Sequence, residues 1–445
     1  MFQSLDSIKK HEVENYIEKS FSVIRTYDWL LDLYVLDFFV DNHWNKLPLS
    51  WRESFNDIDP STLGHILSGK PANIILPLSF LALKRTVDLL SIPRQQKTNM
   101  NITNECGYVG NNPKLKKIFL KHVKLKKRHE IGLMANIVKN VSDKTKCVGV
   151  LDFGSGLGHL VRLLAYKYNL HTAGIECQFQ LTEEARNLDH ELEYTIRKHI
   201  SEENMKKLLK PTHINVTLKN HQQLSLIELP ETLSSYGLVG LHPCGDLGPL
   251  LLKHFASCDK VKFICLVGCC FMKLTDHGYP LSQYAKSLNS HLSYPSREIA
   301  CHAIEVYCDR LRKGDYKDLK IHAYRAALER ILVDIDPKLK HAPVRSIKHS
   351  DTMTFERYCS LAMERLSIPL PTDPDVWSRG QEDVQLWRRV VIVYSLRLAL
   401  APLVETVILL DRLLFVLEQG FSCEILPVFD PKISPRNHIM IAKRQ

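Results

Sequence analysis

Apolar residues recur with two different spacings along this 445-residue chain, and the change between them marks its organisation. From position 12 to about position 90 they follow the three- and four-residue spacing of amphipathic helices, interrupted by prolines. Between 148 and 267 short runs of β-forming residues alternate with helical segments, as in a parallel sheet. The pattern predicts a helical N-terminal unit followed by an α/β domain.

Five runs in the α/β region predict strands. They span 148–153, 170–176, 214–218, 238–241 and 261–267. Helical spacing separates these runs, most clearly at 181–199 and 247–254. Ligands of such sheets bind at the carboxyl ends of the strands, so candidate chemistry is expected just after each run.

Helical spacing then continues for more than a hundred residues before sheet spacing returns at 421–428 and 438–442. These last two runs fit a final antiparallel pair of strands. We expect a helical N-terminal unit with its linker, an α/β domain, a helical insertion and the last two strands of the sheet. The expected bounds are 1–112, 113–283, 284–419 and 420–445.

The first predicted strand ends in an acidic residue and continues into closely spaced glycines, Asp152-Phe153-Gly154-Ser155-Gly156-Leu157-Gly158. Glycine lets the backbone approach a ligand closely, and free amides at the start of the next helix would face that ligand. The dinucleotide fingerprint requires G-x-G-x-x-G, which is a different spacing. Asp-x-Gly-x-Gly-x-Gly is the usual first motif of S-adenosylmethionine methyltransferases. The alternative is a glycine turn with no ligand.

An acidic residue, Glu176, ends the second predicted strand about twenty residues later. At that spacing a carboxylate accepts hydrogen bonds from the ribose hydroxyls of a bound nucleotide. Together the two features predict a class I, Rossmann-like methyltransferase sheet that binds S-adenosyl-L-methionine. The predicted cofactor-binding residues are Asp152, Gly154, Ser155, Gly156, Gly158 and Glu176.

The turns after the fourth and fifth strands carry His242-Pro243-Cys244-Gly245-Asp246 and Gly268-Cys269-Cys270. Three interpretations compete. In the first, His242 deprotonates a weakly acidic acceptor. In the second, His242 and the three cysteines bind zinc, although adjacent cysteines lack the usual two-residue spacing. In the third, the cysteines simply fill tight space. We predict His242, Cys244 and Asp246 as catalytic and assign no metal. Asp246 could instead cap the helix that begins at Leu247.

Methylation of a base amine is disfavoured by the same turn. Such enzymes carry Asn or Asp, two prolines and an aromatic ring there, and that signature is absent after the fourth strand of this chain.

Positive charge is concentrated in one short segment. The chain has a net charge of +10, and eight Lys or Arg residues and no acid lie between Lys114 and Arg128. Such a block either follows the phosphates of a nucleic acid or forms an exposed helix face. We predict RNA as a partner, with substrate-binding residues Lys126, Lys127, His129 and Glu130.

Charged residues early in the chain predict that it has no signal peptide, and it contains twelve cysteines. We therefore expect a reducing, intracellular location, in cytoplasm or nucleus. The apolar segment 390–410 contains Arg397 and Glu405, which favours two buried helices over a membrane span.

Several segments resemble the methyltransferase-like protein 25 family, which includes proteins named for a ribosomal RNA adenine dimethylase domain. They are 126–130, 152–158, 241–247, 267–271, 297–303 and 324–329. The His-x-Cys-Gly turn and the later Cys-Cys pair are also distantly similar to the eukaryotic tRNA methyltransferase that modifies a 2′-hydroxyl of the acceptor stem. The resemblance implies an S-adenosylmethionine-dependent methyltransferase and favours RNA as the acceptor. Protein is the next candidate acceptor, and a non-catalytic binding module that keeps the fold is the alternative from another class.

Overall fold

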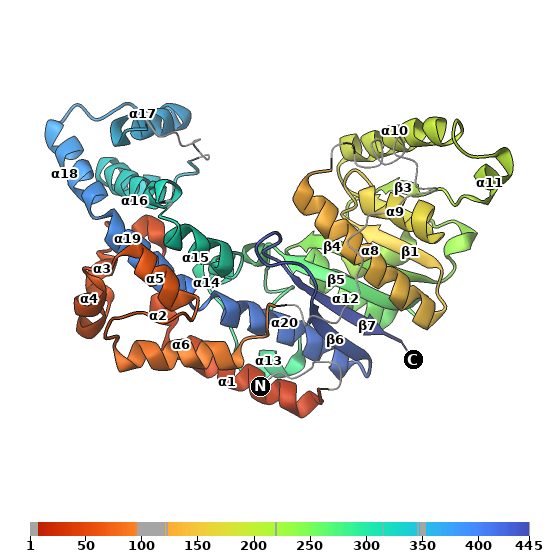
Figure 1. The fold of residues 1–445 in the computed structure, drawn as a ribbon, viewed down its shortest axis with the longest axis horizontal. Coiled ribbons are helices and arrows are strands. Elements are labelled where there is room, and N and C mark those ends of the chain that lie inside the picture. The colour runs from red at the N-terminus through yellow and green to blue at the C-terminus, as the bar shows by residue number, and fades with distance from the viewer. Residues whose placement is uncertain are drawn as a thin grey trace. The chain divides into compact units, whose positions relative to one another are not determined.

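The computed structural model describes residues 8–95, 121, 123–218, 220–314, 316–344, 347 and 353–444. The chain divides into two compact units (Figure 1). The first unit comprises Met1–Phe21, Ile92–His291 and Thr406–Gln445, and the second comprises Ser22–Ser91 and Leu292–Glu405. Much of the segment expected to be a linker, 96–113, lies outside the described residues.

The first unit is built on a sheet of seven described strands in the order β3-β2-β1-β4-β5-β7-β6 (Figure 1). Strands β1 to β5 run parallel, and β7 runs antiparallel to both of its neighbours. The class I, Rossmann-like fold and the final antiparallel pair are therefore confirmed. The strands are β1 (Gly149–Phe153), β2 (His171–Glu176), β3 (Thr212–Asn215), β4 (Tyr236–Cys244), β5 (Val261–Cys269), β6 (Ser422–Pro427) and β7 (His438–Lys443).

Helices cover both faces of this sheet because successive strand residues point to opposite sides. Val150, Val239 and Cys265 lie in one buried cluster with residues of α8, α9 and α10, whereas Leu151 and Leu238 lie in another with residues of α12, α20 and the start of α1. These helices are α8 (Leu125–Thr145), α9 (His159–Tyr168), α10 (Phe179–Ile196), α12 (Leu247–Ser257), α20 (Ala401–Glu418) and α1 (Lys10–Thr26). The unit also contains α11 (Glu202–Lys207), α13 (Gln283–Ser287), η3 (His221–Leu226), η4 (Glu231–Leu233) and η5 (Phe271–Lys273).

The third strand is displaced from its predicted position at 214–218. It begins at Thr212 and ends at Asn215, where it pairs with Glu176, the last residue of β2. A parallel ladder cannot extend past the end of its neighbour, so the β-forming residues that follow are not part of the strand.

The second unit is helical and joins a segment that precedes the first strand of the sheet to the insertion between β5 and β6. Arg397 of α19 is fully buried and donates hydrogen bonds to the carbonyls of Leu31 (3.0 Å) and Pro295 (3.3 Å). The N-terminal helices and the insertion thus share one core. The unit contains α2 (Asp28–Leu31), η1 (Val35–Asp37), α3 (His43–Lys46), α4 (Leu49–Phe55), α5 (Pro60–Leu67), α6 (Leu78–Leu90), α14 (Tyr294–Ile299), α15 (Ile304–Arg312), α16 (Lys317–Ile335), η6 (Pro337–Leu339), α17 (Phe355–Leu366), α18 (Pro374–Gln385) and α19 (Trp387–Leu398).

None of the described helices is long and apolar enough to cross a membrane. The buried carboxylate of Asp411, which directly follows the apolar segment 390–410, has protein partners. Asp411, within α20, accepts hydrogen bonds from the amides of Leu281 (2.7 Å) and Ser282 (2.9 Å) and from the Ser282 hydroxyl (2.7 Å). Such partners offset the cost of burying a carboxylate.

Candidate functional site

The glycine turn after β1 borders open space. Gly154, Gly156 and Gly158 all have positive φ, at 71°, 54° and 70°. A Cβ built on Gly154 or Gly156 would meet no heavy atom within 4 Å, whereas one on Gly158 would lie 2.4 Å from His213 Cε1. The first two glycines therefore leave room for a ligand, and the third is required by packing.

A buried polar network fixes the far end of this turn. His213 Nε2 lies 2.7 Å from Asp189 Oδ2, and the other oxygen of Asp189 pairs with Arg162. Arg162 in turn donates a hydrogen bond to the carbonyl of Leu157 (3.0 Å). The network connects α9, α10 and β3 behind the turn, so the position of Gly158 depends on all three elements.

Glu176, at the end of β2, is hydrogen-bonded to the turn. Its Oε2 accepts a hydrogen bond from the Gly156 amide (3.0 Å), and its Oε1 accepts from the amides of Cys177 and Gln178 (3.0 Å each). Among the described residues Oε2 has this one donor, and a carboxylate oxygen can accept two hydrogen bonds. The carboxylate is therefore held at the strand ends with capacity for one further donor, such as a ribose hydroxyl.

The first two amides of the glycine turn are paired with the neighbouring strand. The amides of Gly154 (2.9 Å) and Ser155 (3.2 Å) donate to the carbonyl of Ile175. These bonds join the turn to β2, so these two amides are not available to a ligand. The Ser155 hydroxyl is buried and has no hydrogen-bond partner within the described chain.

Asp152 carries a buried carboxylate with one unsatisfied oxygen. Its side chain is 3% exposed, and among the described residues Oδ1 has no hydrogen-bond partner. Burial raises the pKa of Asp152 to about 7; the charge of Glu176 adds to the shift and that of Lys127 opposes it. A carboxylate in this state costs folding free energy unless a cation or donor reaches it.

A second group of polar residues lies at the end of β4. His242 Nε2 lies 2.9 Å from Glu130 Oε1, and the same oxygen accepts a hydrogen bond from the Ser434 hydroxyl (2.6 Å). Burial alone would raise the pKa of Glu130, but His242, Ser434 and Lys126, 3.7 Å away, hold it below its usual value. An ionised Glu130 thus connects α8, β4 and the loop after β6.

The predicted substrate-binding residues therefore have different surroundings. His129 Nε2 accepts a hydrogen bond from the Asp430 amide (3.0 Å), so it holds the loop after β6. Lys126 is exposed beside Glu130, and Lys127 is partly exposed. Ser434 was not predicted, and no sequence signal marks it, because it lies 304 residues from its partner Glu130.

The three cysteines of the two turns are brought together. Cys244 Sγ lies 3.3 Å from both Cys269 Sγ and Cys270 Sγ. Hydrogen bonding with Cys269 lowers the pKa of Cys244 to about 5 despite burial, whereas the bond to Cys244 raises the pKa of Cys269 and burial raises that of Cys270. One thiol of the cluster thus ionises well before the other two.

Asp246 holds the turn that follows β5. It accepts hydrogen bonds from the Thr275 amide (2.9 Å) and the Thr275 hydroxyl (2.5 Å). The alternative that Asp246 caps the next helix is wrong, because its side chain makes no capping hydrogen bond at the start of α12. The carboxylate instead binds the turn after β5, where the Thr275 amide and hydroxyl both donate to it.

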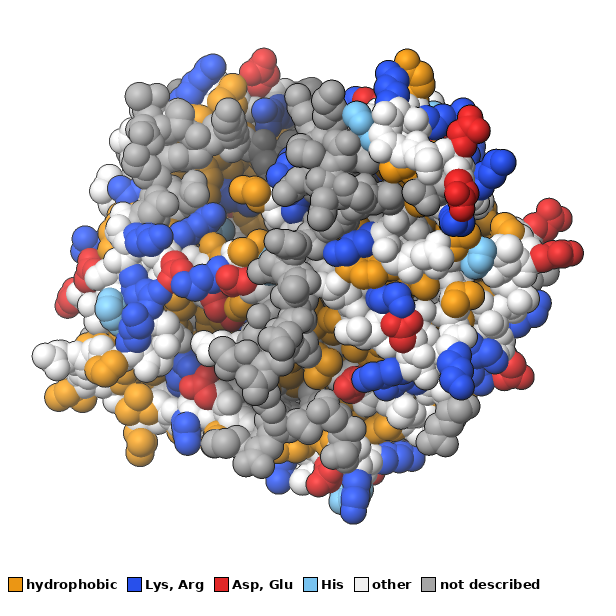
Figure 2. Space-filling model, turned by 45° about the vertical axis from the view of Figure 1, so that its right-hand side comes forward, with side chains coloured by type: hydrophobic (Ala, Val, Ile, Leu, Met, Phe, Trp, Pro, Cys, Tyr) orange, Lys and Arg blue, Asp and Glu red, His pale blue; other side chains and the backbone are white. Residues whose placement is uncertain are grey.

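Only part of the basic block falls within the described chain. Lys114, Lys116 and Lys117 lie outside the described residues, and Lys121 pairs with Glu191 at 2.8 Å. On the face drawn in Figure 2, the visible Lys and Arg side chains of the described residues lie among Asp and Glu side chains. The described part of this face thus carries charges of both signs.

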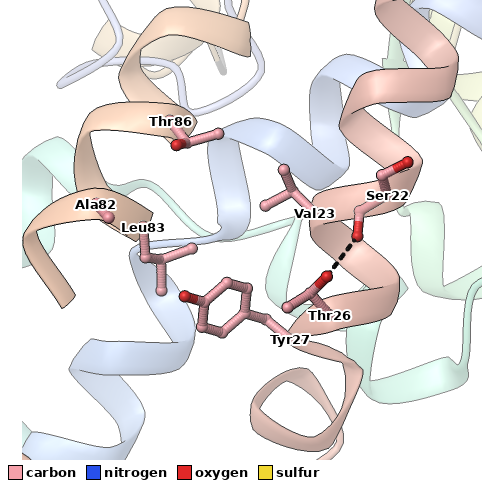
Figure 3. Close-up of a pocket in the computed structure, with 7 residues that line it drawn as sticks. All are labelled: Ser22, Val23, Thr26, Tyr27, Ala82, Leu83 and Thr86. Carbon is pink, nitrogen blue, oxygen red and sulfur yellow. Dashed lines mark hydrogen bonds between the residues drawn. The ribbon is translucent and has the colours of Figure 1, made fainter. Parts of the chain in front are cut away.

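A cavity of about 260 Å³ lies in the second unit, between α1 and α6 (Figure 3). Its lining is uncharged, and the Thr26 hydroxyl that borders it donates to the carbonyl of Ser22 (2.8 Å). The lining residues are Ser22, Val23, Thr26, Tyr27, Ala82, Leu83 and Thr86. None of these side chains has the nucleophilic or acid–base chemistry seen at the strand ends.

Comparison with known proteins agrees with the geometry of the first unit. Residues 126–277 match a family model described as a methyltransferase domain. The chain resembles methyltransferase-like protein 25. It is 29% identical over 238 residues to the Mus musculus protein named probable methyltransferase-like protein 25, and 29% identical over 226 residues to the Homo sapiens protein of that name. The matches cover 49% and 47% of this chain, but only 39% and 37% of the relatives.

A solved structure of coclaurine N-methyltransferase bound to N-methylheliamine and SAH aligns with 98% of this chain and 100% of its own, at 13% identity. The TM-score of 0.24 is too low to bear on the fold.

The methyltransferase domain points to S-adenosyl-L-methionine as the methyl donor. The turn after β1 fits this molecule on three counts: open space at Gly154 and Gly156, a fixed carboxylate at Glu176, and an unsatisfied buried oxygen at Asp152. The donor carries a sulfonium and an ammonium group, so a buried carboxylate beside its site is favourable in charge.

Proposed function

We propose that the chain is an S-adenosyl-L-methionine-dependent methyltransferase that transfers methyl groups to RNA. The observation that carries the proposal is Asp152, a buried carboxylate with an unsatisfied oxygen at the carboxyl edge of a sheet that matches a methyltransferase domain. A fold that had lost its donor would gain stability by replacing this acid. Retention of the acid supports an active donor site.

The donor supplies an electrophilic methyl group when it is bound. In our proposal Glu176 accepts a hydrogen bond from the ribose, Asp152 balances the positive charge, and the backbone at Gly154 and Gly156 allows close approach. The acceptor enters at the adjacent strand end. There His242, whose imidazole is oriented by Glu130, is the candidate to hydrogen-bond the attacking atom.

RNA is favoured by charge. Lys124, Lys126, Lys127 and Arg128 stand at the start of α8, the helix that also carries Glu130 to the end of β4. Cationic side chains that contact phosphates provide most of the baseline affinity for nucleic acids and make it dependent on salt. A basic segment beside the acceptor edge would guide an RNA backbone toward it.

Calorimetric titration of the full chain with S-adenosyl-L-methionine tests the donor site. We expect binding by the unmodified protein and a loss of at least tenfold in affinity for Asp152→Asn and Glu176→Gln. Glu203→Gln is the matched control, because Glu203 is an exposed acid of the same unit that pairs with Lys207 in α11. Absence of binding by the unmodified protein would reject the enzyme and leave the binding-module alternative.

Transfer of labelled methyl groups from the donor into total RNA and total protein tests the acceptor. We expect label in material that is sensitive to ribonuclease and resistant to protease, and an affinity for RNA that falls steeply with salt. Label confined to protein would replace RNA by the other candidate acceptor while leaving the donor site intact.

A further inference from the structure

Three cysteine sulfurs converge at the carboxyl ends of β4 and β5. Cys244 and Cys269 are paired in the register of these strands, and Cys270 follows directly. The sulfur of Cys244 lies 3.3 Å from each of the other two, and all three lie within 4.8 Å of one another. Cys244 is exposed, Cys270 is partly exposed and Cys269 is buried, so the cluster opens to solvent on one side.

The backbone around the cluster is held in an unusual conformation. His242 and Cys270 have φ values of 70° and 50°, in the left-handed region that residues other than glycine avoid, and the β4–β5 register shifts between Leu241 and Cys244.

A buried cation lies against the cluster. Arg412 of α20 is 2% exposed, and its Nε and Nη2 have no hydrogen-bond partner among the described residues. Its guanidinium packs on the backbone just before Cys269, since a Cβ built on Gly268 would lie 2.4 Å from Nη1. The carboxylates of Asp411 and Asp246 and the Cys269 sulfur all interact with this charge. A group with net negative charge at the cluster would stabilise it further.

Another set of potential metal ligands lies in the second unit, and Asp37, one of its acidic residues, already has basic partners. Asp37, Glu329 and His341 lie together, but Asp37 already pairs with His341 (2.8 Å) and with Lys340 (3.5 Å). Protein groups thus balance the charge of Asp37, and this set of ligands needs no metal ion.

We propose that Cys244, Cys269 and Cys270 bind a zinc ion as three thiolates. Soft sulfur ligands select zinc among the available divalent cations, and a zinc tri-thiolate carries one net negative charge, which matches Arg412. Tetrahedral zinc with Zn–S bonds of about 2.3 Å places its sulfurs roughly 3.8 Å apart, so binding requires the cluster to open by about half an ångström. Each S–H bond is replaced by an S–Zn bond, and the protons pass to solvent.

Three protein sulfurs leave the fourth zinc position open on the exposed side, beside Cys244. A site of this composition resembles those in which zinc binds a reactant and not those in which it is purely structural. The inference stands on the cluster alone and holds whether or not the chain transfers methyl groups.

The test uses the full chain, reduced and freed of metal with a chelator, then titrated with zinc and separately with cobalt(II). We expect one zinc per chain by elemental analysis. We also expect cobalt spectra with thiolate charge-transfer bands and the intense visible bands of a tetrahedral site. Cys244→Ser, Cys269→Ser and Cys270→Ser should each lower zinc affinity by at least tenfold. Cys258→Ser, which changes a partly buried cysteine outside the cluster, should leave it unchanged.

Two results would overturn the proposal: reduced protein that takes up no stoichiometric zinc, or equal zinc binding by the cluster variants and Cys258→Ser. Formation of a disulfide by the cluster under peroxide, in protein that binds no zinc, would count as the first result. Cys269 is buried, so its variant risks unfolding; Cys244 is exposed, and circular dichroism of Cys244→Ser separates loss of ligand from loss of fold.

Discussion

His242 Nε2, at the end of β4, lies 2.9 Å from the buried Oε1 of Glu130, in the second turn of α8. The pair joins the end of β4 to the helix that carries the basic residues. Its surroundings leave Glu130 ionised, so the charge of the carboxylate fixes the orientation of the imidazole.

Replacing Glu130 should separate catalytic orientation from stability. We expect Glu130→Gln to slow methyl transfer by roughly 10- to 100-fold, because a misplaced group at a reacting centre costs that much, and to lower unfolding free energy by about 1–3 kcal/mol. Glu298→Gln is the control, since Glu298 forms a Glu–His pair with His302 in the second unit. It should cost similar stability in denaturant titrations without slowing transfer. An equal loss of methyl-transfer rate in both variants would contradict the positioning role of Glu130.

Asp152 should make the empty protein less stable as pH rises. Its folded-state pKa of about 7 exceeds the unfolded value of about 3.9, so the folded state holds the proton more strongly. The associated stability is fully present below about pH 4 and is lost as pH approaches 7, by at most about 4 kcal/mol. Asp152→Asn should therefore be more stable than the unmodified protein at pH 8, with the difference shrinking toward pH 5. Urea titrations across this range measure the difference, and a constant difference would contradict the prediction.

Donor affinity should depend on pH in the opposite direction. A cationic donor favours the ionised carboxylate, so binding should weaken by up to tenfold per unit as pH falls below 7, and should release a proton there. Calorimetry in two buffers of different ionisation enthalpy counts that proton. Asp152→Asn, already weak, should show no such dependence; proton release that persists in this variant would assign the titration to another group.

Alanine substitutions at Gly156 and Gly158 should have different effects on stability and on donor affinity. Gly156→Ala should cost roughly 1–2 kcal/mol from its positive φ alone and reduce donor affinity, because its new methyl group enters the open space. Gly158→Ala should cost more stability, since its methyl group would collide with His213. Gly314→Ala in the second unit has a φ of 71° and no neighbour within 4 Å, and so measures the backbone cost alone. Equal melting temperatures for the Gly158 and Gly314 variants would refute the packing role.

Periodicity was sufficient to predict the sheet, because it is a local property of each segment. The run ending at Phe153, the acid at Glu176 and the terminal antiparallel pair all follow from alternation and short-range spacing. The same reasoning placed His242 and the cysteines at one edge, since parallel strands end together.

Contacts between distant segments could not be predicted in this way. Ser434 reaches Glu130, and Asp246 binds Thr275, through hydrogen bonds that leave no mark on the spacing of either segment. Residues 22–91 and 292–405 form one core partly through side chains such as Arg397. In the sequence, Arg397 is only a charged residue within an apolar segment.

The separation between Glu130 and Ser434 has a consequence for synthesis of the chain. At 5–20 residues per second, the ribosome adds Ser434 roughly 15–60 s after Glu130. The hydrogen bond that ties the glycine turn to Glu176 spans only 20 residues and is available almost at once. We expect the glycine turn and Glu176 to assemble locally on the nascent chain. The contact between Glu130 and Ser434 can form only after Ser434, in the last hairpin, β6–β7, has been synthesised.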